Sequence, residues 1–250
     1  MDRLDTAARA PAIAWYDDEE ALAEAAARHV AALIARRPNA AIAFPTGATP
    51  LATYRRLAAM RADGAFDLSQ ARVFNLDEFA GKGPQDAQSY ANFLGRHLTG
   101  PLALPADHVR FFNGAAPDPE AECAAVERAI EAAGGLDLAV LGLGRNGHVA
   151  FNEPGSAWDS PSRVVELAEE TRAAQGPLYD DPTDVPKFGL TLGLAPLRRA
   201  RSLLLLVSGR GKSAALDALA RGEADPRWPV TSLLGHDNLA VLATRAAANA

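Results

Sequence analysis

A short loop near the start of the chain has the residue types that can bind an anion. It reads Pro45-Thr-Gly-Ala-Thr-Pro50, and the backbone N–H groups and hydroxyls around Gly47, Ala48 and Thr49 can surround a phosphate. Lys212, at the predicted start of a later helix, can add a positive charge to the same anion. The loop is equally consistent with a tight, well-capped strand-to-helix turn, and Lys212 with a solvated surface lysine. Both interpretations stay open on these residues alone.

Two further segments carry groups that can move protons. Asp77 and Glu78 stand at the predicted end of a strand, where a partly desolvated carboxylate can act as a general base. His148 and Glu153 share a glycine-flanked loop, where an imidazole and a carboxylate within reach form a proton relay. Helix capping or a salt bridge for the acids, and a backbone-bonded structural histidine, are the alternatives.

Two segments match nucleotide-binding motifs only in part. Gly142-x-Gly144-x-x-Gly147 matches the dinucleotide fingerprint, but Pro154 follows too soon for the long helix that this motif requires. Gly211-Lys212-Ser213 is similar to the end of a P-loop, but Leu206 stands where that motif needs a glycine. The sequence therefore predicts no nucleotide site.

The predicted elements alternate between strand and helix. Strands are predicted at 40–44, 71–76, 109–112, 136–143, 163–167, 202–207 and 239–243, and helices at 17–37, 50–57, 89–97, 118–133 and 212–221. Asp17 is the predicted N-cap of the first of these helices and Thr49 that of the second. Residues 1–14 are predicted to be a loose lead-in, and one domain is predicted to span 1–250. The alternation predicts an α/β fold with a mostly parallel sheet and helices on both faces. Ligands of such sheets bind beyond the carboxyl ends of the strands, where the candidate residues above also fall.

Composition and charge restrict the possible partners. The 250-residue chain is 48% hydrophobic and carries a formal charge of −6, which disfavours general binding of nucleic acid or anionic membranes. Its single cysteine, Cys123, excludes a disulfide framework, and no histidine spacing or acidic cluster indicates a metal site. The first residues carry acids and no apolar stretch, so we expect no secretory signal and a cytoplasmic location.

Taken in order, these segments resemble the glucosamine-6-phosphate deaminase (isomerase) family. The matching stretches include Phe44–Pro50, Phe74–Phe79, Ser162-Arg163, Val185–Lys187 and Gly209–Lys212, and together they cover nearly the whole chain. The most specific stretch is Gly142-Leu-Gly-Arg-Asn-Gly-His-Val-Ala-Phe-Asn-Glu-Pro-Gly155. Its Phe-Asn-Glu-Pro continuation distinguishes deaminases from the related 6-phosphogluconolactonases, which share the fold and a Gly-His loop.

The resemblance implies a modified doubly wound, Rossmann-like sheet and an amino-sugar phosphate substrate. The family reaction converts glucosamine 6-phosphate and water into fructose 6-phosphate and ammonia, and it needs no metal or organic cofactor. We class this aldose–ketose isomerisation with deamination among the hydrolases of amino-sugar metabolism. Galactosamine-6-phosphate deamination and 6-phosphogluconolactonase-type hydrolysis are the alternatives, and a non-catalytic sugar-phosphate sensor is a third.

The resemblance also implies a role for each candidate residue. Asp77 corresponds to the general base that moves a proton between C2 and C1, and His148 to the residue that opens the sugar ring. Glu153 corresponds to the acidic partner of His148, and Asn146 lies where many members carry an aspartate that completes the relay. The implied phosphate ligands are Gly47, Ala48, Thr49 and Lys212. The implied supporting residues are Glu78 and Arg163.

Two departures from the family pattern have consequences. Gly176-Pro177 stands where many deaminases have a phosphate-binding arginine, so we expect a substitute from Arg172, Arg210 or another chain. Arg163 fits the activator site of hexameric members, but Val165 stands where a lysine is expected. We therefore expect no activation by N-acetylglucosamine 6-phosphate, and a monomer or dimer is as consistent with the sequence as a hexamer.

Overall fold

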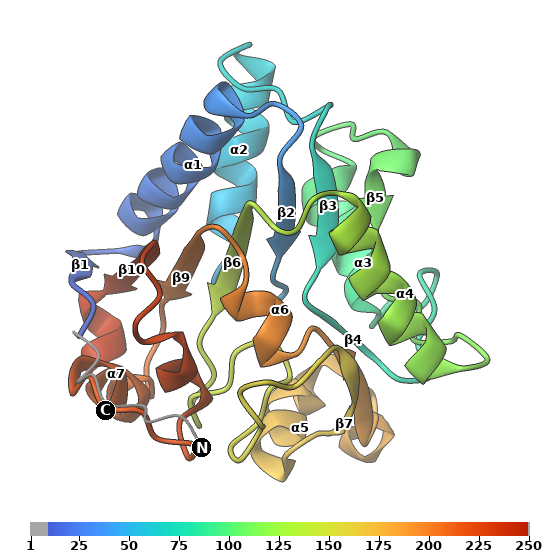
Figure 1. The fold of residues 1–250 in the computed structure, drawn as a ribbon, viewed down its shortest axis with the longest axis vertical. Helices are drawn as coiled ribbons and strands as arrows, with labels where there is room; N and C mark the ends of the chain where they lie inside the picture. Colours follow the sequence, from blue (N-terminus) through green and yellow to red (C-terminus); the bar gives the residue numbers. More distant parts are fainter. Residues whose placement is uncertain (1–9, 250) are drawn as a thin grey trace.

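The computed structural model describes residues 10–249, whose central feature is a seven-stranded parallel sheet (Figure 1). The strand order is β1-β10-β9-β6-β2-β3-β5. The strands are β1 (Ile13–Tyr16), β2 (Ala41–Phe44), β3 (Arg72–Asn75), β5 (Val109–Arg110), β6 (Leu138–Gly142), β9 (Leu203–Val207) and β10 (Leu239–Thr244). The predicted α/β class and its mostly parallel sheet are confirmed.

Helices cover both faces of this sheet, as predicted. One face packs against α1 (Glu19–Arg36), α2 (Leu51–Ala62) and α3 (Tyr90–Leu94). The other packs against α4 (Pro119–Ala132), α6 (Leu194–Arg198) and α7 (Ser213–Ala220). The strands β2 and β9 are buried along their whole length, and their successive side chains alternate between the two cores. This is why they appear as uninterrupted apolar runs in the sequence.

A second, antiparallel sheet lies beyond the carboxyl ends of the central strands (Figure 1). Its order is β4-β8-β7, from β4 (Asp77–Phe79), β8 (Phe188–Thr191) and β7 (Arg163–Glu166), and α5 (Glu169–Gln175) follows β7. Three segments that are distant in the sequence meet here because Thr191 pairs with both Asp77 and Arg163 in the ladder. The small sheet thus carries residues predicted for the site to the edge of the large one.

The order of the central strands creates a crevice between β2 and β6. From β2 the chain proceeds outward through β3 and β5, and it then returns to place β6 on the opposite side of β2. The loops after β2 and β6 therefore lead to opposite faces of the sheet and diverge. Such a switch point is where open α/β sheets bind their ligands.

Three local predictions at helix and strand starts were wrong. Ile13 and Ala14, assigned to the loose lead-in, begin β1, which pairs with β10; residues 1–9 of that lead-in lie outside the described residues. The first helix is capped by Asp18 rather than Asp17, because the Asp18 carboxylate accepts the Ala21 N–H at 2.8 Å. Thr49 does not cap α2, since its hydroxyl contacts Ser208 and Pro50 takes the cap position.

Candidate active site

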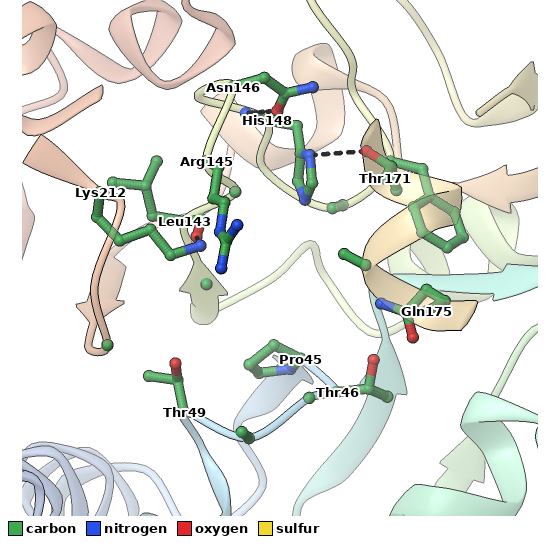
Figure 2. A pocket seen from close by; sticks show the side chains of 18 of the residues that line it. Pro45, Thr46, Thr49, Leu143, Arg145, Asn146, His148, Thr171, Gln175 and Lys212 are labelled. Carbon is green, nitrogen blue, oxygen red and sulfur yellow. Dashed lines mark hydrogen bonds between the residues drawn. The ribbon is translucent and has the colours of Figure 1, made fainter. Parts of the chain in front are cut away.

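A cavity of about 410 Å³ occupies the crevice between β2 and β6. Its walls come from the loops after β2, β6 and β9, from Asp77 of β4 and from α5 (Figure 2). The predicted site residues that line it are Gly47, Ala48, Thr49, Asp77, Asn146, His148 and Lys212. Glu78, Glu153 and Arg163 do not line the cavity and act on it only through neighbours.

Asp77 presents a nearly dry carboxyl group to this cavity. The residue is 6% exposed, and burial, followed by the nearby charge of Glu78, raises its pKa well above the usual value. Its backbone is fixed by Asn75, whose side chain donates to the Asp77 carbonyl at 2.8 Å while accepting the Phe112 N–H. A desolvated and rigidly held carboxyl group has the properties required of a general base near neutral pH.

Glu78 is fully buried and is held by donors on every side. Its carboxylate accepts hydrogen bonds from the backbone N–H groups of Phe79, Tyr90 and Ala91 and from the Ser89 hydroxyl, at 2.8–2.9 Å. Burial raises the pKa of Glu78, and these four donors oppose that shift. Glu78 therefore anchors α3 to β4 and fixes the strand that carries Asp77.

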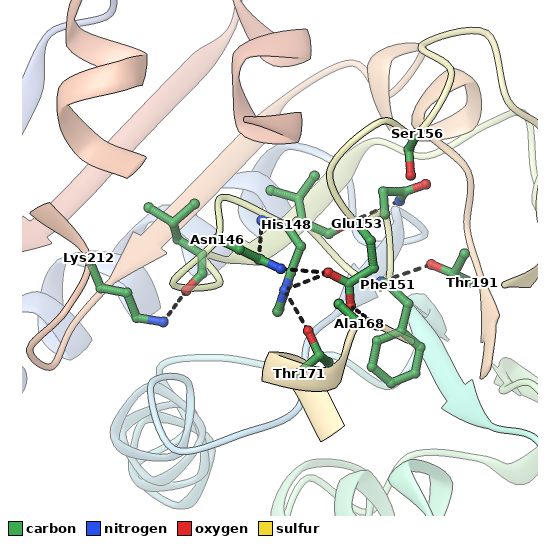
Figure 3. Close-up of polar contacts among 12 residues, drawn as sticks. Asn146, His148, Phe151, Glu153, Ser156, Ala168, Thr171, Thr191 and Lys212 are labelled. Carbon is green, nitrogen blue, oxygen red and sulfur yellow. Dashed lines mark hydrogen bonds and ion pairs between the residues drawn. The ribbon is translucent and has the colours of Figure 1, made fainter. Parts of the chain in front are cut away.

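His148 forms a relay with Glu153 and Asn146 (Figure 3). Its Nδ1 lies 3.5 Å from Glu153 Oε2 and 3.3 Å from Thr171 Oγ1. The Asn146 amide donates to the same Glu153 oxygen at 2.8 Å, and its carbonyl accepts the His148 backbone N–H. Because Nδ1 faces these partners, Nε2 is left to face the cavity (Figure 2).

The Glu153 carboxylate is kept ionised by the same contacts. Burial alone would raise its pKa, but hydrogen bonds from His148, Thr171 and Asn146 lower the pKa of Glu153 below its ordinary value. The Ala168 N–H also donates to Oε1 at 3.3 Å. A carboxylate beside Nδ1 accepts the proton of that nitrogen, so Nε2 is the nitrogen through which His148 can accept and return a proton.

Glycines in this loop serve packing and not nucleotide binding. A Cβ on Gly144 would lie 2.4 Å from the His148 ring, so only glycine permits the imidazole to lie against the backbone there. Gly147 has a φ of +82° and packs against Trp228. No helix follows directly, since the next element after β6 is β7. The rejection of a dinucleotide fingerprint agrees with this geometry.

Arg163 braces the loop that carries Glu153. Its guanidinium donates to Asn152 Oδ1 and Ser160 Oγ at 3.0 Å and to Ser156 Oγ at 3.1 Å. Asn152 is fully buried and also donates to the carbonyls of Val149 and Leu192. Arg163 therefore uses its donors on internal partners of the loop that follows His148.

The other end of the cavity is suited to an anion. Within residues 10–249, the backbone N–H groups of Gly47, Ala48 and Thr49 donate to no other group. Gly47 has a φ of +96°, which turns the loop sharply. Thr49 Oγ1 lies 3.0 Å from the Oγ of Ser208, which belongs to the loop after β9. Lys212 is half-buried, and its ammonium donates to the Leu143 carbonyl at 2.6 Å. Desolvation and then the charge of Arg145 lower the pKa of Lys212.

The sequence interpretation missed three residues of this site. Thr171 contacts His148 from α5, Ser208 bridges to Thr49, and Arg145 lines the cavity beside Lys212. Thr171 is a common residue type that lies far along the chain from its partner, so no local pattern gives it this role. Ser208 directly follows a predicted strand, which marks it as a candidate ligand residue without showing that it contacts Thr49. Arg145 lies between Gly144 and Asn146, within the most specific stretch of the sequence.

The structure describes no cluster of metal ligands. Among residues 10–249, no three His, Cys, Asp or Glu side chains gather so that they could hold a metal ion. The absence of a metal or cofactor requirement stays a prediction. None of the helices in the described part of the chain has the length and apolarity needed to span a membrane.

Comparison with known proteins identifies the class. The model of the family described as glucosamine-6-phosphate isomerases/6-phosphogluconolactonase matches residues 17–241. The glucosamine-6-phosphate deaminase of Bacillus pumilus is 37% identical over 232 residues, which are 93% of this chain and 96% of that protein. The deaminase of Beutenbergia cavernae is 39% identical over 221 residues, which are 88% of this chain and 85% of that protein.

Solved structures lead to the same class. A monomeric glucosamine-6-phosphate deaminase of the NagB superfamily superposes with a TM-score of 0.92 at 33% identity, over 94% of this chain and 98% of that one. A 6-phosphogluconolactonase from Thermotoga maritima has a TM-score of 0.75 at 22% identity, over 93% of this chain and 99% of that one, and shows the shared fold only. Fold and site thus define an α/β protein of the sugar-phosphate isomerase and lactonase class. The chain belongs to the glucosamine-6-phosphate isomerase/6-phosphogluconolactonase family.

Proposed function

We propose that this protein is a glucosamine-6-phosphate deaminase, which converts glucosamine 6-phosphate and water into fructose 6-phosphate and ammonia. One observation carries the proposal: the desolvated carboxyl of Asp77 and the His148–Glu153 pair meet in one cavity whose far end offers free N–H groups and cations. These groups correspond to three features of the substrate. Asp77 can remove the proton on C2, the His148–Glu153 pair can protonate the ring oxygen, and the far end of the cavity can bind the phosphate.

The first step opens the sugar ring. Nε2 of His148 faces the cavity, where it accepts the proton of the C1 hydroxyl and returns it to the ring oxygen as the C1–O bond breaks, so C1 becomes an aldehyde. Glu153 does not touch the cavity, so it acts as a positioning residue that holds the imidazole by Nδ1 and stabilises its charge. Asn146 aligns this pair, and its amide supplies orientation without the charge that an aspartate would add.

The second step moves a proton from C2 to C1. Asp77, as the carboxylate, removes the C2 proton while the C1 oxygen takes a proton from the C2 ammonium group, which forms an enolamine. Asp77 then returns its proton to C1, which leaves an iminium at C2. Water then adds to C2 and ammonia departs, so both products are released. Hydrolysis enters only in this last exchange, and the reaction is better described as an isomerisation with deamination. Glu78 supports the step by fixing the strand of Asp77.

Phosphate binding supplies the energy that positions the sugar. Gly47, Ala48 and Thr49 offer backbone donors, and Lys212 offers a charge from the loop after β9. The protein carries a net negative charge, so the anion depends on these concentrated local donors. We infer that the whole chain acts as one sugar-phosphate domain; a cytoplasmic location and a homo-oligomer remain predictions.

The deciding experiment measures ammonia and fructose 6-phosphate released from glucosamine 6-phosphate by the purified protein. Equal amounts of both products support the proposal. Galactosamine 6-phosphate and 6-phosphogluconolactone are assayed in parallel. Ammonia from galactosamine 6-phosphate alone would make that compound the assigned substrate. Lactone hydrolysis without ammonia from either amino sugar would refute deamination.

A further inference from the structure

The guanidinium of Arg145 stands at the anion end of the cavity without a partner of its own. Arg145 follows β6, and its side chain extends along Gly211, where a Cβ would lie 3.4 Å from the Arg145 Nε. Within residues 10–249 it makes no hydrogen bond and no ion pair of the kind that occupies Arg110, Arg163 or Arg201. Figure 2 shows it reaching into the cavity beside Lys212, across from Thr49.

Arg145 and Lys212 together leave positive charge unneutralised in one place. The ammonium of Lys212 is half-buried and has no carboxylate within ion-pair distance among the described residues; its hydrogen bond is to the neutral Leu143 carbonyl. Glu170 also lines the cavity, and its charge acts on Lys212 from a longer distance. Two adjacent cations repel each other, so an arrangement of this kind favours a ligand with more than one negative charge.

We propose that Arg145 is a phosphate-binding residue of this cavity, which recognises the substrate's dianionic phosphate together with Lys212 and the loop at 47–49. The inference rests on the proposed function and extends it to a residue that determines phosphate specificity. A guanidinium presents a planar fork that can hold two phosphate oxygens at once, whereas Lys212 acts as a point charge. Arg145 therefore replaces the phosphate-binding arginine that many deaminases have where this sequence has Gly176-Pro177. The sequence had suggested Arg172 or Arg210 for this role.

Of the two expected substitutes, Arg172 is engaged elsewhere, whereas Arg210 resembles Arg145 in lining the cavity. Arg172 donates to the Val185 carbonyl at 3.2 Å and does not line the cavity. Arg210 lines the cavity from the same loop as Lys212, so it is the competitor that an experiment must separate from Arg145. Arg145 differs from Arg210 in its place in the chain, because it is next in sequence to Asn146, in the turn that carries His148.

The test compares phosphate binding and turnover in matched variants. Binding of inorganic phosphate is measured by calorimetry on the wild type and on Arg145→Ala, Arg145→Lys, Arg210→Ala and Arg128→Ala. Arg128 is an exposed arginine of α4 outside the cavity, so its removal controls for the loss of one charge. We expect Arg145→Ala to weaken phosphate binding about ten- to hundred-fold, as the loss of a charge-assisted contact does. Arg145→Lys should recover part of the loss, and Arg128→Ala should bind as the wild type.

Turnover gives a second readout that separates recognition from folding. In Arg145→Ala the KM for glucosamine 6-phosphate should rise more than kcat falls, whereas a folding defect would lower the amount of active enzyme and leave KM unchanged. Phosphate binding within twofold of wild type in Arg145→Ala, or the loss appearing in Arg210→Ala instead, would overturn the assignment. Phosphate binding that depends on Arg145 in a protein that releases no ammonia would refute the proposed reaction and leave this assignment standing.

Discussion

At the scale of single residues, the chemistry depends on the contrast between two carboxyl groups. Asp77 is desolvated and lies near a like charge, which raises its pKa, whereas hydrogen bonds lower the pKa of Glu153. The raised pKa makes the Asp77 carboxylate a stronger base than an exposed carboxylate, and the lowered pKa of Glu153 keeps that carboxylate charged beside His148. The two acids have different tasks although their ordinary pKa values are similar.

Replacing Asp77 by asparagine should abolish deamination. The amide of the asparagine side chain cannot accept a proton from carbon, so kcat should fall by about 10²–10⁴-fold, the usual contribution of a general base. Phosphate binding should stay within a few-fold of wild type, because the anion end of the cavity is unchanged. Ammonia release and phosphate calorimetry check both halves, with the exposed Asp107→Asn as the control. Substantial deamination by Asp77→Asn would show that another group is the base.

The same substitution should stabilise the fold at neutral pH. Unfolded Asp77 ionises near its ordinary pKa of 3.8, and the folded residue ionises at a higher pH. Between these pKa values only the folded protein holds the proton, so stability decreases as pH rises through that window. Asparagine lacks this penalty and should raise the free energy of unfolding by about 0.5–2 kcal/mol, as relief of functional-site strain commonly does.

Urea unfolding of wild type and Asp77→Asn at about pH 4 and about pH 7.5 measures this effect. The difference between the two proteins should be larger at the higher pH, where the wild-type carboxyl is forced toward ionisation. A difference that is the same at both pH values would contradict the assigned shift of the Asp77 pKa.

At the scale of elements, the small antiparallel sheet brings the parts of the site together. Thr191 of β8 pairs with Asp77 of β4 and with Arg163 of β7, and its hydroxyl accepts the Phe151 N–H from the histidine loop at 3.1 Å. Thr191 therefore connects β4, which carries Asp77, with β7, which carries Arg163, and with the loop that carries His148. None of these connections is local in the sequence.

Arg163→Ala should weaken both the loop and the catalysis. The change leaves the buried Asn152 Oδ1 without its donor, so unfolding should be easier by about 1.5–3 kcal/mol. The kcat should fall because Glu153 directly follows Asn152, and Arg163→Lys should restore part of both losses. Urea unfolding and steady-state kinetics, with Arg128→Ala as the matched control, test this. Unchanged stability together with a lost response to an activator would instead assign Arg163 to effector binding.

At the scale of the whole molecule, the engagement of Arg163 bears on regulation. Its donors are taken by Asn152, Ser156 and Ser160, and Val165 offers no cation beside it. The rate should therefore depend hyperbolically on glucosamine 6-phosphate, and N-acetylglucosamine 6-phosphate should not activate the enzyme. Initial rates over a range of substrate, with and without that compound, check this. A sigmoidal curve that becomes hyperbolic on its addition would show an activator site.

The local sequence was enough to predict the fold class and several of the residues that line the cavity. Alternating apolar runs and capped helices predict a parallel sheet with two covered faces, because a strand buried on both sides has to be apolar throughout. Asp77, His148 and Asn146 were found since each directly follows a buried strand or lies in the glycine-rich loop after one, where ligands bind. The resemblance to a known family supplied their expected roles.

Tertiary structure alone decided which groups belong together at the site. Thr171 and Ser208 are ordinary residues whose significance comes from partners elsewhere in the chain, such as Thr49, which lies 159 residues from Ser208. Arg145 is significant because the fold brings it to the cavity beside Lys212. The cap of α1 was misassigned by one position because Asp17 and Asp18 are adjacent and either carboxylate could accept the same N–H groups. The pKa of Asp77 was likewise inaccessible to sequence, because it is raised mainly by burial, and burial is a property only of the folded molecule.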